Sequence, residues 1–370
     1  GHNVEKQKCP EVRFKGYDQN WRLKKLEAIG IFNPYSNLPQ EFEYVDLESV
    51  VGTELINSRK ETIETAPSRA QRLASRGDVF YQAVRPYQKN NYLFDLPYDN
   101  YVFSTGYIQI RPTINSYYLL SIVQKNDFVQ KVLENCTGTS YPAINTTGLK
   151  SIDVFISNEA NEQTQIGNFF QNLDQSIALQ EKKLTQTQNL KKAMLEKMFP
   201  KAGSKQPEIR LKGFSGDWEK KLLQDEVEFF SGLTYSPDDL TNKNGTLVLR
   251  SSNVQNNQIC TDDNVYVVHD AVNVCNVEVG DIIVVVRNGS RSLIGKHAVI
   301  NKQMKNTVIG AFMTGVKAKN PYFINALFDT SLFDLAVSRN LGATINQITT
   351  GMFKQMEGRV KLEVRHKPPN

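Results

Sequence analysis

The longest regular alternation of apolar and polar residues runs from about Asn158 to Pro200. No Gly or Pro falls between Asn168 and Phe199. Apolar residues recur there at alternating steps of four and three, with Gln180 as the one polar member of the series. This spacing keeps one side of a helix facing a partner helix. We call this side the seam, and its apolar members are Ile166, Phe170, Leu173, Ile177 and Leu184.

The stretch is therefore predicted to be one long helix. At 1.5 Å per residue, about 40 residues span about 60 Å, which is longer than an ordinary domain is wide. Its acidic residues lie mainly in the first half and its lysines mainly in the second, an order that suits the helix macrodipole and an antiparallel partner. We expect a spacer between two bodies, with a buried helix of one large domain as the alternative.

The chain contains the same opening twice, which indicates an internal repeat. Pro-Glu-Val-Arg-Phe-Lys-Gly-Tyr at 10–17 returns as Pro-Glu-Ile-Arg-Leu-Lys-Gly-Phe at 207–214, and Trp21 and Trp218 follow at the same spacing. Further on, Gly-Asp-Val-Phe at 77–80 returns as Gly-Asp-Ile-Ile at 280–283. The chain is therefore predicted to hold two copies of one domain joined by the long helix.

Each copy is predicted to mix helices and strands. Residues 79–81 and 282–286 are β-branched or aromatic runs that follow Gly-Asp turns, as short strands do. Residues 117–123 and 322–328 are predicted helices that follow a proline or a polar turn. The fold class is α+β, with two pseudo-repeated globular domains separated by a long α-helix of the coiled-coil type. The expected segments are 1–157 for the first domain, 158–200 for the helix, 201–206 for a linker and 207–370 for the second domain.

Composition and charge narrow the possible partners. No apolar run is long enough to cross a bilayer and the start has no apolar leader, so we expect a cytoplasmic protein. Cys9, Cys136, Cys260 and Cys275 are scattered without a C-x-x-C pair, which predicts neither a zinc knuckle nor a disulfide framework. The net charge of +5 is modest, so binding to DNA would need specific contacts or partner subunits besides charge.

The order of these features resembles the specificity (S) subunit of type I restriction–modification systems, over nearly the whole chain. The resemblance rests on the repeated opening, on Ala-Pro-Ser-Arg-Ala at 66–70, on Ser-Thr-Gly-Tyr at 104–107 and on Leu-Arg-Ser-Ser-Asn at 249–253. It also rests on Asn-Gly-Ser-Arg-Ser-Leu-Ile-Gly-Lys at 288–296. The long helix looks like the central conserved region of that family.

The resemblance implies a sequence-specific DNA-recognition subunit that reads a bipartite double-stranded target through two target-recognition domains. Paired helices would hold the domains apart and dock modification (methyltransferase) and restriction subunits. Half-site centres about one helical turn apart, about 34–36 Å, would face the same side of the duplex, so the helix length would set the unread gap.

One departure from the family concerns the end of the chain. A second conserved helix follows the second domain in the family, but only Arg365 to Asn370 follow Val364 here. This helix is therefore expected to be absent, either naturally or by truncation. The seam would then pair with a second copy, a separately encoded helix or the modification subunits.

Base reading needs hydrogen-bonding side chains on exposed loops, with cations for phosphate. The first-domain candidates are Arg69, Arg72, Arg76, Arg85, Tyr87, Lys89 and Asn90. The second-domain candidates are Arg250, Ser252, Asn253, Arg287, Asn288, Ser290, Arg291 and Lys296. Arg and Asn are expected to read bases, while Lys and Ser would hold phosphate. Taken singly, each is better explained as a solvated surface residue, so the prediction rests on the clusters.

Catalytic motifs are not found. An adenine methyltransferase needs an Asn/Asp-Pro-Pro-Tyr/Phe loop, and residues 33–35, 95–98 and 320–322 each lack the second proline. There is no Walker-type loop, and the histidines lack partners at metal-ligand spacing. We expect no catalytic residue, metal or cofactor. The alternatives are a non-enzymatic protein–protein scaffold with duplicated binding domains and an enzyme in its own right.

Overall fold

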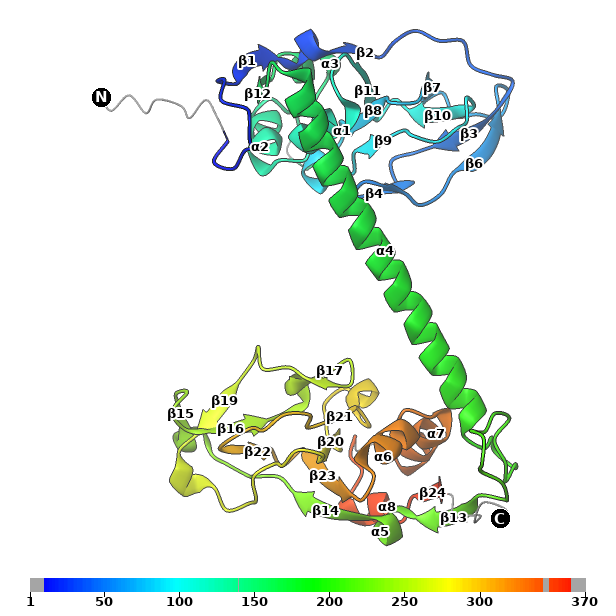
Figure 1. Cartoon of the computed structure of the whole chain (residues 1–370), viewed down its shortest axis with the longest axis vertical. Helices are drawn as coiled ribbons and strands as arrows, with labels where there is room; N and C mark the ends of the chain where they lie inside the picture. The colour runs from blue at the N-terminus through cyan, green and yellow to red at the C-terminus, as the bar shows by residue number, and fades with distance from the viewer. Residues whose placement is uncertain (1–9, 139, 342–345, 361–370) are drawn as a thin grey trace. The chain divides into compact units, whose positions relative to one another are not determined.

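The computed structural model describes residues 10–138, 140–341 and 346–360. The chain divides into two compact units, Gly1–Lys182 and Lys183–Asn370. The division falls inside the helix α4 (Ala160–Met198), which continues for 39 residues from the first unit into the second (Figure 1). The predicted long helix between two sheet-rich domains is thus confirmed. The finer boundaries at 157, 200 and 206 stay a prediction.

The first unit holds two four-stranded sheets, a two-stranded ribbon and a small hairpin (Figure 1). One sheet has the order β6 (Arg59–Thr62), β3 (Glu41–Val45), β10 (Tyr101–Ser104), β7 (Ala70–Leu73). The other has the order β2 (Gly30–Phe32), β11 (Tyr107–Pro112), β8 (Val79–Gln82), β9 (Tyr92–Leu93). The ribbon pairs β1 (Arg22–Lys25) with β12 (Asp153–Ile156), and the hairpin pairs β4 (Val50–Val51) with β5 (Glu54–Leu55). Strands β3 and β10 run parallel.

Three helices complete this unit: α1 (Ser116–Val123), α2 (Asn126–Glu134) and α3 (Thr146–Lys150). Strand β8 shows how the layers are held together, because successive side chains of a strand point to opposite faces. Val79 and Tyr81 enter the core shared with the three helices. Phe80 faces the other sheet and stacks on Phe103, with 3.7 Å between ring centroids. The β2-β11-β8-β9 sheet is therefore the middle layer.

The second unit contains the same kinds of element. One sheet has the order β14 (Val227–Ser231), β23 (Met313–Ala318), β20 (Ile282–Val285), β21 (His297–Val299). The other has the order β15 (Leu240–Thr241), β19 (Val265–Val267), β16 (Thr246–Leu249), β22 (Thr307–Ile309). The ribbon is β13 (Glu219–Leu222) with β24 (Glu357–Val360), and the hairpin is β17 (Val254–Gln255) with β18 (Gln258–Ile259). The helices are α5 (Leu223–Glu226), α6 (Pro321–Phe328), α7 (Ser331–Asn340) and α8 (Thr350–Lys354).

The predicted repeat is confirmed element by element. The ribbons β1–β12 and β13–β24 correspond, and so do the helices α1, α2, α3 and α6, α7, α8. The parallel pair β3–β10 returns as β16–β22. Strand β20 is apolar throughout because it is buried on both faces, as β8 is. Ile282 and Val284 pack under the helices, and Ile283 and Val285 pack between the sheets. The units differ at their outer edges, where β7 extends one sheet and β15 extends its counterpart.

Helix α4 is anchored to each unit by different contacts. In the first unit the buried carboxylate of Glu162 accepts a hydrogen bond from Arg13 Nε at 2.6 Å. In the second unit Phe199, directly after the helix, packs on Trp218 with 5.7 Å between ring centroids, and Lys191 Nζ lies 2.8 Å from Asp329. Each tryptophan of the repeated opening therefore packs inside its unit, as Trp21 does edge-on against Tyr118.

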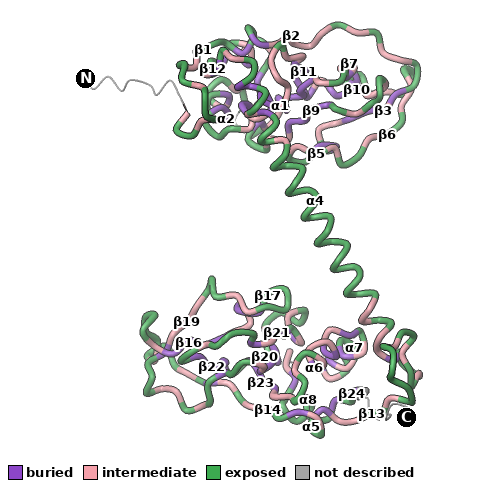
Figure 2. The backbone as a smooth tube through the Cα atoms, in the orientation of Figure 1, coloured by how far each residue is buried: buried purple, intermediate pink, exposed green. Residues whose placement is uncertain are grey.

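The seam of α4 is covered only at its start within the described chain. Ile166 packs against the core of the first unit. Phe170 and Leu173 are each 43% exposed, Ile177 is 56% exposed and Leu184 is 58% exposed. Figure 2 shows this exposure along the middle of the helix. The expected absence of a second conserved helix concerns residues beyond 360, which lie outside the described residues.

Candidate nucleic-acid interface

In the first unit, several loops meet around a depression of about 480 Å³. The loop after β8 continues into a short 3₁₀ turn at Pro86–Gln88, and the β4–β5 hairpin lies against it. The sequence-predicted residues that line the depression are Arg69, Arg85 and Asn90. Its other polar residues, which sequence reasoning missed, are Asp46, Glu48, Gln82, Gln88 and Ser104.

Amide side chains hold these loops together. Asn90 Oδ1 accepts a hydrogen bond from Gly52 N at 2.8 Å, which ties the hairpin to the loop after β8. Gln82 Nε2 donates to Gln88 Oε1 at 2.8 Å, and Asn90 N donates to Gln82 Oε1 at 3.3 Å. Asn90 is predicted to read a base, but its Oδ1 is already hydrogen-bonded to the hairpin, so Asn90 also helps to hold the depression in place.

One of the two acids that line the depression is paired with a cation, whereas its two arginines are not paired with a described carboxylate. Asp46 forms an ion pair with Arg59 at 3.0 Å, outside the predicted cluster. Arg69 and Arg85 have no carboxylate within ion-pair distance among the described residues. The depression therefore presents two available guanidinium groups beside several amides, and these groups match phosphate and base edges.

The remaining first-unit candidates do not gather there. Arg72 lies in β7, is half-buried, and has its pKa lowered by burial. Arg76 is exposed and bound to Asp95 at 2.6 Å, a hydrogen bond that raises its pKa. Tyr87 is exposed, and Lys89 donates to Asn126 at the start of α2. Arg72 in particular is part of a sheet and not of an open loop.

In the second unit the loops after β16 and β20 are hydrogen-bonded to each other. Asn288 Nδ2 donates to Ser251 Oγ at 2.9 Å. Arg250 directly follows β16 and pairs with Asp263 at 2.9 Å. Arg287 lies over the ring of Phe312, with Cζ 4.8 Å from the ring centroid. The two loops that carry Arg250, Arg287 and Asn288 are therefore in contact.

The other second-unit candidates lie around this group. Ser252 is half-buried in the 3₁₀ turn Ser251–Asn253. Ser290 is exposed and hydrogen-bonded to Ser292. Arg291 donates to Leu341 O at 3.3 Å, and Lys296 is exposed.

The prediction that Asn253 contacts DNA needs correction, because this residue lies in the interior with no exposed surface. Its Oδ1 accepts from Arg250 N at 2.9 Å, and its Nδ2 donates to Cys260 O at 2.9 Å. The counterpart in the first unit is Ser49, which is also buried and accepts from Asp46 N. Both residues stabilise the hairpin that follows them, so Asn253 is a structural residue and does not face a base.

The structure adds three negative findings about the described residues. They contain no group of three His, Cys, Asp or Glu side chains able to hold a metal ion. Within the same ranges, no helix is long and apolar enough to span a bilayer. Cys136, Cys260 and Cys275 are free, while Cys9 lies outside the described ranges.

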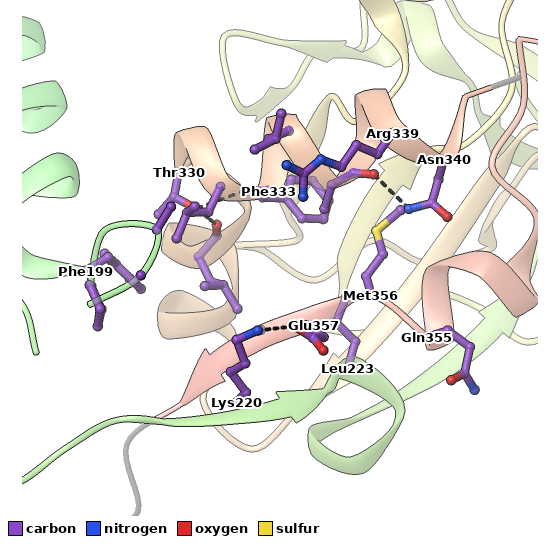
Figure 3. A pocket seen from close by; sticks show the side chains of 18 residues that line it. Phe199, Lys220, Leu223, Thr330, Phe333, Arg339, Asn340, Gln355, Met356 and Glu357 are labelled. Carbon is purple, nitrogen blue, oxygen red and sulfur yellow. Dashed lines mark hydrogen bonds and ion pairs between the residues drawn. The ribbon is translucent and has the colours of Figure 1, made fainter. Parts of the chain in front are cut away.

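A separate groove of about 350 Å³ lies in the second unit beside α7 and the β13–β24 ribbon (Figure 3). Its wall is largely apolar and includes Leu223, Phe333 and Met356. Lys220 Nζ bonds to Glu357 across the ribbon at 2.8 Å. No sequence-predicted DNA-binding residue lines this groove, so it is distinct from the candidate interface.

Part of the chain is similar to known proteins. Residues 36–189 match the sequence model of the type I restriction modification DNA specificity domain. The specificity subunit of the type I restriction enzyme HindI from Haemophilus influenzae is 26% identical over 155 residues, which are 40% of this chain and 32% of that subunit. The match thus spans about a third of the relative's length.

One of the solved structures compared shares the fold. The S subunit of a type I restriction–modification system from M. genitalium superposes with a TM-score of 0.63 at 12% identity, over 92% of this chain and 84% of that one. The HsdS subunit from Thermoanaerobacter tengcongensis is 18% identical over 92% of this chain and 84% of its own, with a TM-score of 0.39. The resemblance predicted from the sequence motifs is confirmed, because residues 36–189 match the specificity-domain model and the chain is similar to type I restriction–modification specificity subunits.

Proposed function

We propose that this chain is the sequence-specific DNA-recognition subunit of a type I restriction–modification complex, and that each unit reads one half of a bipartite double-stranded target. The observation that carries the proposal is the duplication. One fold occurs twice on a single continuous helix, and each copy gathers arginine and amide side chains on the loops after its central strands. Two similar readers on one chain suit two separated half-sites.

Arginine and amide groups would read base edges, whereas lysine and hydroxyl groups would hold the phosphates. In the first unit, Arg69 and Arg85 have the geometry for this because both line one depression and neither is paired with a carboxylate among the described residues. In the second unit, Arg287 and Asn288 play the corresponding part.

The exposed part of the α4 seam would be covered by a helix of another polypeptide. A stripe of Phe170, Leu173, Ile177 and Leu184 at coiled-coil spacing is costly to leave in water. The partner would be a second copy, a separately encoded helix or a modification subunit. Methyl transfer and cleavage would be carried out by the docked modification and restriction subunits, and this chain would supply no catalytic group.

Methylome sequencing of cells that carry the complete complex tests the proposal. A modified motif made of two specific parts around an unread gap is expected, and a continuous motif would contradict bipartite reading. Fluorescence polarisation with duplexes carrying that motif then tests Arg69→Glu, which should abolish the base preference of one half only. Arg22→Glu, in the exposed edge of β1, is the matched control.

A salt series separates this proposal from a protein–protein scaffold. A DNA reader should show log affinity falling steeply with log salt concentration. A scaffold with duplicated protein-binding domains should show no binding to the motif duplex at any salt concentration.

A further inference from the structure

Four arginines of the candidate interface fall into two pairs according to their partners. Arg76 and Arg250 are paired with Asp95 and Asp263. Arg85 and Arg287 instead lie over aromatic rings, and neither forms an ion pair within the described residues. Their charge is therefore not neutralised by the protein.

The two arginine–ring contacts have the same separation. Arg85 Cζ lies 4.8 Å from the ring centroid of Tyr141, and Arg287 Cζ lies 4.8 Å from that of Phe312. Both rings are unusually open to solvent, since Tyr141 is 66% exposed and Phe312 is 52% exposed. Stacking fixes the plane of a guanidinium and leaves the N–H groups on its edge able to donate. An arginine held against an exposed ring therefore has its N–H donors fixed in position and open to a ligand.

The two arginines occupy neighbouring places in the repeated fold. Val84 forms an isolated bridge with Ala143 after β8, and Arg287 forms the corresponding bridge with Gln347 after β20. Arg85 is the next residue after Val84. The arginines are thus one position apart in the shared loop.

Each arginine also takes its aromatic ring from a different segment. Tyr141 comes from the loop between α2 and α3, whereas Phe312 comes from the turn between β22 and β23. Because the two copies reach the same arrangement with different residues, the arrangement is not a relic of a shared motif.

Arg85 also carries backbone strain. Its φ of 54° and ψ of 56° are left-handed, a conformation that Gly or Asn adopts at lower energy. Its side chain makes no capping hydrogen bond to the turn that follows. The local fold does not explain an arginine at this position, so a ligand outside the protein is the better reason for it.

We propose that Arg85 and Arg287 are the guanine-reading residues of the two units, and that each half of the target contains a guanine contacted by one of them. A flat guanidinium donates two parallel hydrogen bonds to guanine O6 and N7 in the major groove, and no other base edge accepts this pair. This inference rests on the proposed DNA-reading function and adds a base to each half-site.

The test uses the full chain with its modification subunits and selects duplexes from a randomised pool that includes the methylated motif. Arg85→Lys keeps the positive charge but loses the fork. It should therefore lower binding to the guanine-containing half-site by about 5- to 150-fold and relax preference at that one position. Arg287→Lys should do the same in the other half. Tyr141→Leu should weaken the same guanine preference as Arg85→Lys, and Arg22→Lys should change nothing.

The possible outcomes separate the inference from the function beneath it. If the wild-type complex selects no sequence, the proposed function fails. If it selects a bipartite motif but either half lacks guanine, or Arg85→Lys leaves every base preference unchanged, only the present inference is overturned. A phosphate contact would give a different result: Arg85→Ala would lose affinity equally for all sequences and show a shallower salt slope, while Arg85→Lys would keep full affinity. That result would also overturn the present inference.

Discussion

Replacing Glu162 with alanine tests how α4 is anchored to the first unit. Both carboxylate oxygens accept from Arg13, at 2.6 Å from Nε and 2.8 Å from Nη2. The Glu162 side chain has no exposed surface, and that of Arg13 is 13% exposed. Burial alone would raise the pKa of Glu162, but the Arg13 guanidinium outweighs burial and holds that pKa below its ordinary value. The residue is therefore a buried carboxylate with a bidentate partner.

Removing one member of a buried ion pair costs about 3–5 kcal/mol, because the remaining charge loses its counter-ion. Arg13 regains some water through its exposed part, so we expect Glu162→Ala to lower the free energy of unfolding of the first unit by about 3 kcal/mol. Urea unfolding of the full chain measures this. In a Trp218→Phe background, Trp21 fluorescence reports on the first unit alone. The midpoint should fall by about 1–3 M, given a slope of about 1–3 kcal/mol per M.

Asp127→Asn is the matched control because Asp127 pairs with Lys125 at 3.0 Å and both side chains are more than half exposed. Exposed pairs contribute about 0–1 kcal/mol, so the control should change little. A loss in Glu162→Ala no larger than that of the control would refute the claim that this pair anchors the helix.

Four further predictions use the same framework. Because the folded pKa of Glu162 is below its ordinary value of 4.5, its stabilisation is present above pH 4.5 and is lost as the pH falls through the folded pKa. Acid unfolding of the first unit should therefore become easier as the pH falls below that ordinary value, and Glu162→Gln should remove this component. A Gly-to-Ala change inside a helix ordinarily stabilises it by about 1 kcal/mol. In Gly167→Ala, however, the new Cβ would lie 2.2 Å from Oδ1 of Asn115, the N-cap of α1, so the free energy of unfolding should fall by about 1–2 kcal/mol. A rise in that free energy would show that the helix can shift. Asn253→Ala should cost about 2–3 kcal/mol in the second unit and speed proteolysis of the β17–β18 hairpin, whereas unchanged proteolysis would contradict its structural role. If a second copy covers the seam, Ile177→Glu should reduce the mass measured by light scattering to that of one chain, and a monomeric wild type at micromolar concentration would exclude that partner.

The regular elements could be predicted from the sequence because their patterns depend on local rules. Helix α4 keeps its apolar period with one polar exception, Gln180, and lacks Gly and Pro over most of its length, so one helix is the simplest interpretation. Strand β20 is apolar at every position, which is typical of a strand buried on both faces. The repeated opening at Pro10 and Pro207 then indicated two copies of one fold.

The candidate interface was predicted only as two clusters, because its shape depends on contacts between distant loops. The depression exists because the β4–β5 hairpin is tied to the loop after β8 through Gly52 and Asn90, which are far apart in the chain. The burial of Asn253 was missed for the same reason. Residues 46–49 and 250–253 hold corresponding places in the two units but share no residue identity, so sequence comparison could not show that Asn253 replaces the buried Ser49.

The corner between the first two helices of each unit shows how the copies diverged while keeping one fold. In the first unit the buried Asn91 donates to Gln124, the C-cap of α1, at 3.2 Å. The corresponding residues of the second unit are His297 and Asp329, the C-cap of α6, which approach to 3.3 Å.

The carboxylate of Asp329 takes the place of the Gln124 amide in the second unit. It gives α4 a contact through an ion pair with Lys191. Burial would raise the pKa of Asp329, but His297 and Lys191 outweigh it and lower that pKa. The hairpin residue Asn257 also donates to this carboxylate. Asp329 therefore joins the β17–β18 hairpin, the β20–β21 layer and α4 at one point. Asp329→Asn should therefore weaken both the packing of the β17–β18 hairpin and the contact of the second unit with α4. Gln124→Ala in the first unit should loosen only the loop after β8. Amide hydrogen exchange measures both effects. If either substitution changed the exchange rates of the two units equally, the proposed difference between the two corners would be contradicted.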